Sequence, residues 1–103
     1  MSTRAQIQVE GSKVLVYKHH DGYPDGRHGV LAWLEPFARD FVKRRGFVVD
    51  YMTARIVVHG VAQDLIEGND NGATGWGVDT VIHGDTEYLY TVKMDGSVVV
   101  RKL

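Results

Sequence analysis

Histidines and aspartates are concentrated in one short stretch, which runs from Tyr17 to His28. Three of the five histidines lie in it, at positions 19, 20 and 28, together with aspartates at 21 and 25. Imidazoles and carboxylates are the side chains that hold metal ions or transfer protons. The stretch lies where a predicted strand ends and a predicted helix begins, a junction at which rigid elements hold functional groups in place. It is therefore the first candidate for chemistry in this chain.

A metal site in this stretch is not favoured. A catalytic zinc site takes about three protein ligands and keeps one open position. Neighbouring residues on a strand point to opposite faces, so His19 and His20 cannot readily share an ion. The chain also has no HExxH or HxxxH spelling. In the structural alternative, Asp21 caps the turn and His19 hydrogen-bonds across the sheet. We expect no metal and no cofactor.

Catalysis has weak support in the residue pattern. General acid–base catalysis needs a histidine or carboxylate beside a nucleophile. Candidates by residue type alone are Asp21, His83, Asp85 and Glu87. The glycines between 72 and 77 lack the lysine, the preceding strand and the following helix of a phosphate-binding loop. We predict no catalytic residue, and a binding protein is favoured over an enzyme.

Size and charge narrow the class of protein. The chain has 103 residues, a formal net charge of −1 and no cysteine. We expect one domain over residues 1–103, which can bury a core without a disulfide. The balanced charge lacks the basic field of sequence-independent nucleic-acid binding, so nucleic acid is not expected as a main partner. No signal-like or membrane-spanning apolar run is present, which favours a cytoplasmic protein without a membrane partner.

The first twenty residues predict a β-hairpin. Apolar and polar residues alternate over 5–10, and Gly11-Ser12 suits a two-residue type II′ turn. This turn places Val9 opposite Val14 and Ile7 opposite Val16. One face is then apolar, and the other carries Tyr17 and His19. A slip of one residue would exchange the two faces.

Two helices are expected in the middle of the chain. Apolar residues recur at spacings of three and four over 30–45, where Pro36 either kinks the helix or begins a shorter one. A second helix is expected over 50–67 with Asp50 as its N-cap, although the β-branched run 56–58 also suits a strand. Its core-facing stripe is predicted to be Tyr51, Ala54, Val58, Val61 or Ala62, and Leu65.

The last third predicts a loop and a three-stranded antiparallel meander. Residues 68–75 serve as a connector, or alternatively as a flap or anion-binding nest. Gly84-Asp85 and Asp95-Gly96 are predicted two-residue hairpin turns within 76–103. With these turns Asp79 opposes Tyr90 and Tyr90 opposes Arg101, which makes a row across three strands.

The fold class expected is therefore α+β. An antiparallel sheet in ββ-αα-βββ order would have two helices packed on one face. The other face would carry Tyr17 and His19 beside Tyr88 and Tyr90.

Two motifs in the chain are specific in spelling and spacing. They are Tyr17-x-His19-x-Asp21-Gly22-Tyr23-Pro24 and His83-Gly84-Asp85-Thr86-Glu87-Tyr88-Leu89-Tyr90, with Gly75-Trp76-Gly77 before the second and Arg4-Ala5-Gln6-Ile7 at the start. Together they resemble a family of small uncharacterised phage and bacterial proteins, over nearly the whole chain. The resemblance implies a phage or prophage context and no agreed activity. His20 stands where the family has an aromatic residue.

The function expected is that of a small non-enzymatic binding protein of phage or mobile-element type. It would occupy a host protein, for example a CRISPR effector, and so act against host defence. Tyrosine and arginine are preferred interface anchors. The expected binding residues are Tyr17, His19, Asp21, Tyr23, Asp79, His83, Tyr88, Tyr90 and Arg101. The alternative is a nucleotide or small-molecule binding protein or hydrolase with His19, Asp21, His83 and Glu87 round a pocket. The remaining alternative is that these tyrosines have no binding role and only pack on a half-buried sheet face. A homodimer through an edge strand is also compatible with the sequence.

Overall fold

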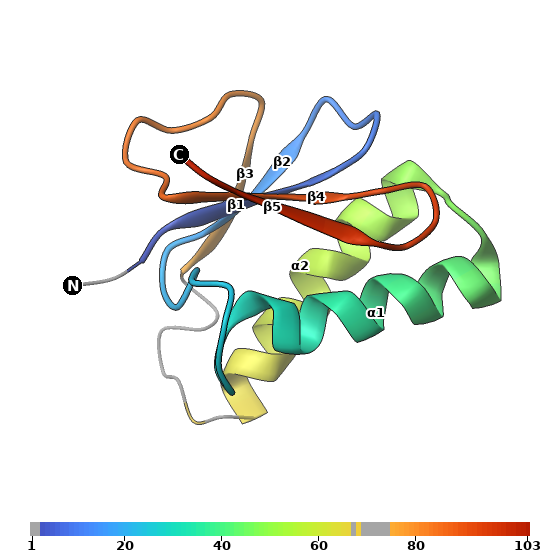
Figure 1. Cartoon of the computed structure of the whole chain (residues 1–103), viewed down its shortest axis with the longest axis horizontal. Coiled ribbons are helices and arrows are strands. Elements are labelled where there is room, and N and C mark those ends of the chain that lie inside the picture. The colour runs from blue at the N-terminus through green and yellow to red at the C-terminus, as the bar shows by residue number, and fades with distance from the viewer. Residues whose placement is uncertain (1–2, 67, 69–74) are drawn as a thin grey trace.

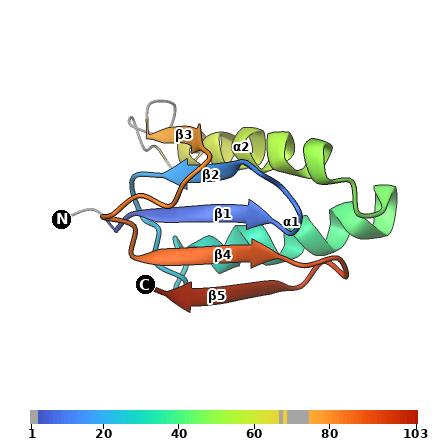
Figure 2. The same cartoon turned by 90° about the horizontal axis from the view of Figure 1, so that it is seen from above.

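The computed structural model describes residues 3–66, 68 and 75–103. In chain order its elements are β1 (Ala5–Val9), β2 (Leu15–Lys18), α1 (Val30–Arg45), α2 (Val49–Ile66), β3 (Trp76–Asp79), β4 (Tyr88–Val92) and β5 (Val98–Lys102) (Figure 1). The predicted α+β class and ββ-αα-βββ order are confirmed. The strands form one sheet in the order β3-β2-β1-β4-β5, and both helices lie on the same face of it (Figure 2).

The sheet is mixed, which corrects the expectation of a purely antiparallel sheet. β1 and β4 run parallel with Ile7 opposite Tyr90, and the other neighbours are antiparallel. The predicted pairing of β3 with β4 is wrong. The Gly84-Asp85 turn does form, closed by a 3.2 Å hydrogen bond from the Thr86 N–H to the His83 carbonyl. However, β3 joins the outer edge of β2 and β4 joins the outer edge of β1, so a turn sequence alone did not determine the pairing.

The register of the first hairpin is confirmed, with Ile7 opposite Val16. Its turn lies one residue earlier than predicted. The Ser12 N–H donates to the Val9 carbonyl over 2.8 Å, and Gly11 at the third position of this turn has φ +89°. The predicted apolar face is right, because Ile7, Val9 and Val16 are all buried in the core.

The last hairpin is shifted by one residue from the prediction, since Tyr90 lies opposite Val100 and not Arg101. The Lys93 N–H donates to the Ser97 carbonyl over 2.8 Å, so the loop holds three residues. Gly96 takes the left-handed position that such a loop requires, with φ +86°. A shift of one residue exchanges the faces of a strand. Tyr88 and Tyr90 therefore point to the helices, and the predicted row of Asp79, Tyr90 and Arg101 does not exist.

The first helix has the predicted bounds, Val30–Arg45. Pro36 lies inside it, so the alternative of a shorter helix that begins at Pro36 is wrong. The helix ends at Gly46, whose φ of +77° is costly for other residues and whose N–H donates to the Val42 carbonyl. The buried side chains of α1 are Val30, Trp33, Leu34, Ala38 and Phe41.

The predicted core stripe of α2 is wrong, because it faces solvent. The buried positions are instead Met52, Ile56, Gly60 and Asp64. A methyl group at Gly60 would collide with the indole of Trp76, so this glycine lets β3 pack closely on the helix. The helix begins at Val49, which places Asp50 in the first turn and not at the N-cap.

A charged pair is buried between β2 and α2. The Lys18 Nζ lies 3.4 Å from Asp64 Oδ2, and their side chains are 2% and 11% exposed. The Trp76 indole N–H donates to the same Asp64 oxygen over 2.9 Å, while Lys18 Nζ lies 4.6 Å from the centre of the Trp76 ring. Among the described residues every buried side-chain nitrogen and oxygen has a hydrogen-bond partner.

No helix in the described part of the chain is long and apolar enough to cross a membrane. The predicted loop over 68–75 lies mostly outside the described residues, since only 68 and 75 belong to them.

Candidate functional site

The helices cover one face of the sheet, and we call the opposite face the open face. By strand register, its side chains come from Gly77 and Asp79, Leu15 and Tyr17, Gln6 and Gln8, Leu89 and Thr91, and Val99 and Arg101. Residues 80–87 cross this face to connect β3 with β4 on the far side of β1 (Figure 2). The open face is thus a sheet surface with one irregular segment laid across it.

Gln6 attaches the crossing segment to the sheet. Its side chain is fully buried, and its Nε2 donates to the Val81 carbonyl over 2.9 Å. Its Oε1 accepts hydrogen bonds from the His83 N–H at 2.9 Å and from the Thr86 hydroxyl at 2.8 Å. Three contacts to one side chain fix the path of residues 81–86, and that path places the His83 ring over β2.

His83 is held from two sides. Its ring centre lies 4.6 Å from that of Tyr17, with 32° between the planes, and its Nε2 lies 2.6 Å from Asp79 Oδ2. The hydrogen bond from His83, and next the one from the Thr80 N–H, lower the pKa of the Asp79 carboxyl. The imidazole is therefore fixed in position before any partner arrives.

Tyr17 links His83 to His19 and, through His19, to Arg4 near the N-terminus. Its hydroxyl lies 2.9 Å from Nδ1 of His19, and Arg4 Nε lies 3.3 Å from the same nitrogen. Arg4 Nε also forms an ion pair of 3.2 Å with Asp85. Burial, and next the charge of Asp85, raise the pKa of the Tyr17 hydroxyl. We name this group the His–Tyr cluster: Arg4, Tyr17, His19, Asp79, His83 and Asp85.

The structure thus brings four predicted binding residues together, namely Tyr17, His19, Asp79 and His83. Arg4 and Asp85 belong with them; Arg4 was missed as a site residue, and Asp85 was named as a catalytic candidate by residue type but not as a binding residue. Both stood in the motifs of the sequence resemblance, where Arg4 counted as part of a strand and Asp85 as part of a turn. Arg101 shares the open face but lies three strands from Tyr17, about 15 Å away at the usual strand spacing.

The other predicted binding residues lie on the helix side or at the end of the sheet. Tyr90 is fully buried, and its hydroxyl donates to the Gly22 carbonyl over 2.6 Å. Burial raises the pKa of this hydroxyl strongly. Tyr88 packs against the same core, with its ring 6.5 Å from that of Tyr90.

The Asp21-Gly22-Tyr23-Pro24 loop is a structural corner. Asp21 has φ +53°, and a methyl group at Gly22 would lie 2.7 Å from the Cβ of Ala5. The Tyr23 and Pro24 carbonyls accept hydrogen bonds from the first two N–H groups of α1, at 2.9 and 3.2 Å. The loop therefore holds the start of α1 against the sheet.

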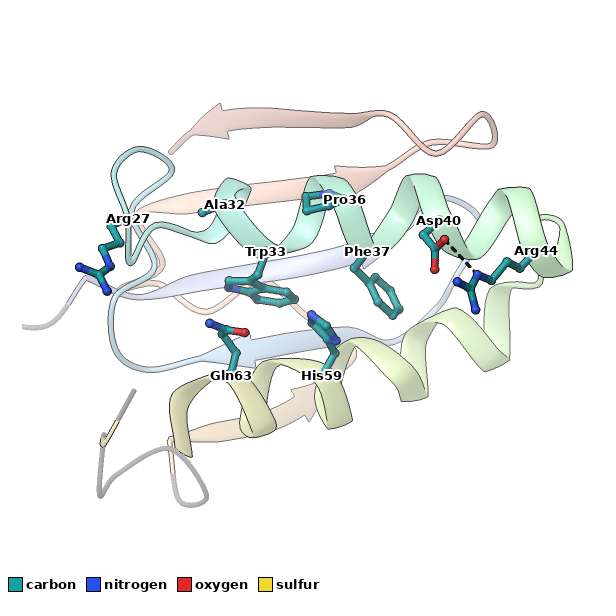
Figure 3. A pocket seen from close by; sticks show the side chains of 9 residues that line it. All are labelled: Arg27, Ala32, Trp33, Pro36, Phe37, Asp40, Arg44, His59 and Gln63. Carbon is teal, nitrogen blue, oxygen red and sulfur yellow. Dashed lines mark hydrogen bonds and ion pairs between the residues drawn. The ribbon is translucent and has the colours of Figure 1, made fainter. Parts of the chain in front are cut away.

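A second feature is a groove between the helices, with a volume of about 650 Å³ (Figure 3). Trp33 and Phe37 of α1 face His59 of α2, with ring centres 5.8 and 5.1 Å from the His59 ring. Arg27 stands at one end, and Arg44 at the other is bonded to Asp40 over 3.0 Å. No residue pattern indicated this groove, because Trp33 and Phe37 fit an ordinary core stripe.

The chemistry open to the His–Tyr cluster is limited. A carboxylate that orients an imidazole is part of many general bases. Within the described residues, however, the His83 ring bonds to Asp79 and to no serine or threonine hydroxyl. Nor do any three His, Asp or Glu side chains of these residues stand close enough to hold a metal ion. The contacts that the structure shows for the His83 ring are those with Asp79 and with the Tyr17 ring.

No family model, curated protein or solved structure matches this chain. The resemblance to small phage and bacterial proteins therefore rests on the two motifs alone. What the open face can do has to be argued from its own residues.

Proposed function

We propose that this chain is a non-enzymatic protein-binding module whose contact surface is the open face with the His–Tyr cluster. The observation that carries the proposal is the fixed Tyr17–His83 ring pair on a sheet face that no helix covers. Rigid aromatic groups lose little conformational entropy when a partner binds, and they are common interface anchors. A contact surface of this kind needs no further ordering.

Apolar side chains extend the surface around the cluster. Val81, Ile82 and Val99 are 59%, 45% and 52% exposed. Protein interfaces combine such an apolar part with a polar rim. Here the rim is supplied by the Arg4–Asp85 ion pair and by Asp79. The mixture of both charge signs favours a protein surface over the uniformly negative backbone of a nucleic acid.

The sequence resemblance to phage proteins supports a host protein as the partner. A component of host defence, such as a CRISPR effector, is the first partner to test. Occupation of a host protein requires a stable surface, and the fixed His83–Asp79 contact provides part of one.

The groove between the helices supports a second candidate function. A hollow of about 650 Å³ with aromatic walls and arginines at its ends has the size of a small-molecule site. A nucleobase could stack on the exposed His59 ring. This alternative differs from the predicted His/Asp pocket, since Asp21 lies in the corner loop and not beside His83.

Three substitutions distinguish these functions. Val81→Asp places a charge on the open face, whereas Val58→Asp places the same charge on the outer side of α2 at equal exposure, 59% against 60%. Binding to a purified CRISPR effector, measured by biolayer interferometry, should weaken at least tenfold for Val81→Asp and stay unchanged for Val58→Asp. Equal binding by both variants would show that the open face is not the contact surface. Calorimetric heat with a nucleotide panel, lost in His59→Ala, would favour the groove instead.

A further inference from the structure

The outer side of α2 is apolar although nothing in the described structure covers it. Its members, which we call the outer stripe, are Tyr51, Ala54, Val58, Ala62 and Leu65. Tyr51, Val58 and Leu65 are 54%, 60% and 54% exposed. The opposite side of the same helix packs Met52 and Ile56 into the core. A helix that is apolar on two opposite sides is normally buried on both.

The outer stripe is symmetric about Val58. Ala54 and Ala62 stand four residues before and after it, and Tyr51 and Leu65 stand seven residues before and after it. At a rise of 1.5 Å per residue, these pairs lie about 6 and about 10 Å on either side of Val58 along the helix. When a two-fold axis perpendicular to α2 passes between two antiparallel copies beside Val58, each residue lies level with the partner residue equally far beyond Val58, so alanines lie level with alanines and large side chains with large ones.

We propose that a second copy of this chain covers the outer stripe, with α2 of one protomer antiparallel to α2 of its partner. A two-fold interface must be self-complementary, and the stripe meets that condition in its sizes. Val58 lies beside the axis, against its own copy. Tyr51 packs against Leu65 of the partner subunit, and the alanines let the helices approach closely.

The two ends of the stripe are complementary in shape. Beside Tyr51 there is a hollow of about 380 Å³ between Phe41, Arg45 and Arg55. At the other end Leu65 and Ile66 protrude, 54% and 80% exposed. The two-fold axis brings each protruding end to the hollow of the other copy.

The ends are also complementary in charge. The hollow is bordered by Arg45, which lies over the Tyr51 ring at 5.1 Å, and by Arg55. The described residues of the last turn of α2 include no basic one, so no side chain of that turn offsets the negative end of the helix dipole. An antiparallel pair places the arginines of one copy at this negative end of the other. A parallel pair would bring like ends together.

The dimer should be reversible. A contact based on one helix of 18 residues is smaller than the standard interface of about 1,600 Å². We therefore expect dissociation in the micromolar range.

Single cysteines test both the occupant and the register, because the chain has no cysteine of its own. Under mild oxidation Val58→Cys should give mostly covalent dimer. Tyr51→Cys and Leu65→Cys should each give little alone, but should cross-link to each other when mixed. Val99→Cys, similarly exposed at 52% on the open face, measures random collision. Cross-linking of Val58→Cys no stronger than that of Val99→Cys would overturn the proposal, as would self-linking of Tyr51→Cys equal to that of Val58→Cys.

Sedimentation equilibrium gives an independent result without cross-linking. The mass of the unsubstituted chain should rise from 11.5 kDa toward twice that value between about 1 and 300 μM, and Val58→Asp should stay at 11.5 kDa. A constant 11.5 kDa for the unsubstituted chain would overturn the proposal. If Val58→Asp then also lost binding to a purified host protein, that protein and not a second copy would be the occupant. Binding through the open face is measured separately, with Val81→Asp, so the two proposals can fail independently.

Discussion

The hydroxyl of Tyr90 donates a hydrogen bond of 2.6 Å to the main-chain carbonyl of Gly22, which joins the middle of β4 to a loop 68 residues earlier in the chain. Both groups are buried, so the carbonyl has no access to water. The bond explains why the Asp-Gly-Tyr-Pro loop is a corner of the fold.

Tyr90→Phe should lower the free energy of unfolding by about 1–3 kcal/mol, because it leaves the Gly22 carbonyl buried without a partner. Urea denaturation followed by circular dichroism measures the change. Tyr88→Phe is the control, since its hydroxyl forms no hydrogen bond with any of the described residues, and it should cost less than about 0.5 kcal/mol. Equal losses for the two variants would show that the Tyr90 bond adds nothing to stability.

The buried pair of Lys18 and Asp64 should behave as a unit. Among the described residues, Lys18→Met leaves the buried Asp64 carboxylate with the Trp76 N–H as its one hydrogen-bond partner, and it should cost about 3 kcal/mol or more. The double variant Lys18→Met/Asp64→Leu removes both charges and should cost clearly less than the sum of its single changes. A double-mutant cycle of urea denaturation curves provides the test. Strict additivity would mean that the two charges do not depend on each other.

Gly60→Ala should destabilise the protein, although the same change usually stabilises a helix by about 1 kcal/mol. The added methyl group would collide with the Trp76 ring, which the Asp64 hydrogen bond holds in place. Overpacking of this kind costs about 1–3 kcal/mol. Thermal unfolding measures the sign, and a higher melting temperature for Gly60→Ala would show that β3 and α2 pack more loosely than described.

A fall in pH should weaken the hydrogen bond between Asp79 and His83. The folded-state pKa of Asp79 is lowered by the hydrogen bond from His83, so its contribution to stability is present above the unfolded pKa of about 4 and is lost as the pH falls through the lower folded value. Asp79→Asn should therefore reduce the urea midpoint at pH 6, and the difference from the unsubstituted protein should shrink as the pH falls below the unfolded pKa of about 4. Glu10 and Asp95 also have lowered pKa values, so the variant will keep part of the acid dependence. A constant difference between the two proteins at every pH would contradict the assignment.

Local sequence signals predicted much of the fold. The bounds of α1 and the register of Ile7 against Val16 followed from residue spacing, because each depends on near neighbours in the chain. The meander failed for a non-local reason. The β1–β2 hairpin has two free edges, and nothing in the Gly84-Asp85 turn indicates that β3 and β4 take one edge each.

The candidate site was predicted only in part. Tyr17 and His83 were correctly predicted to lie on the same face of the sheet, which is the open face. The shift of one residue in the last hairpin places Tyr88 and Tyr90 on the helix-covered face instead. Periodicity also placed the wrong side of α2 in the core. Both sides are apolar, and the buried side contains Gly60 and Asp64, whose roles depend on Trp76 and Lys18 from distant strands.

Binding of the open face to a host defence protein can be tested in cells, by phage infection of a CRISPR-immune bacterium that expresses the chain. The unsubstituted protein should raise the efficiency of plaquing, Val81→Asp should abolish that rise, and Val58→Asp should keep most of it at equal cellular protein levels. No rise with the unsubstituted protein, or a full rise with Val81→Asp, would contradict the account.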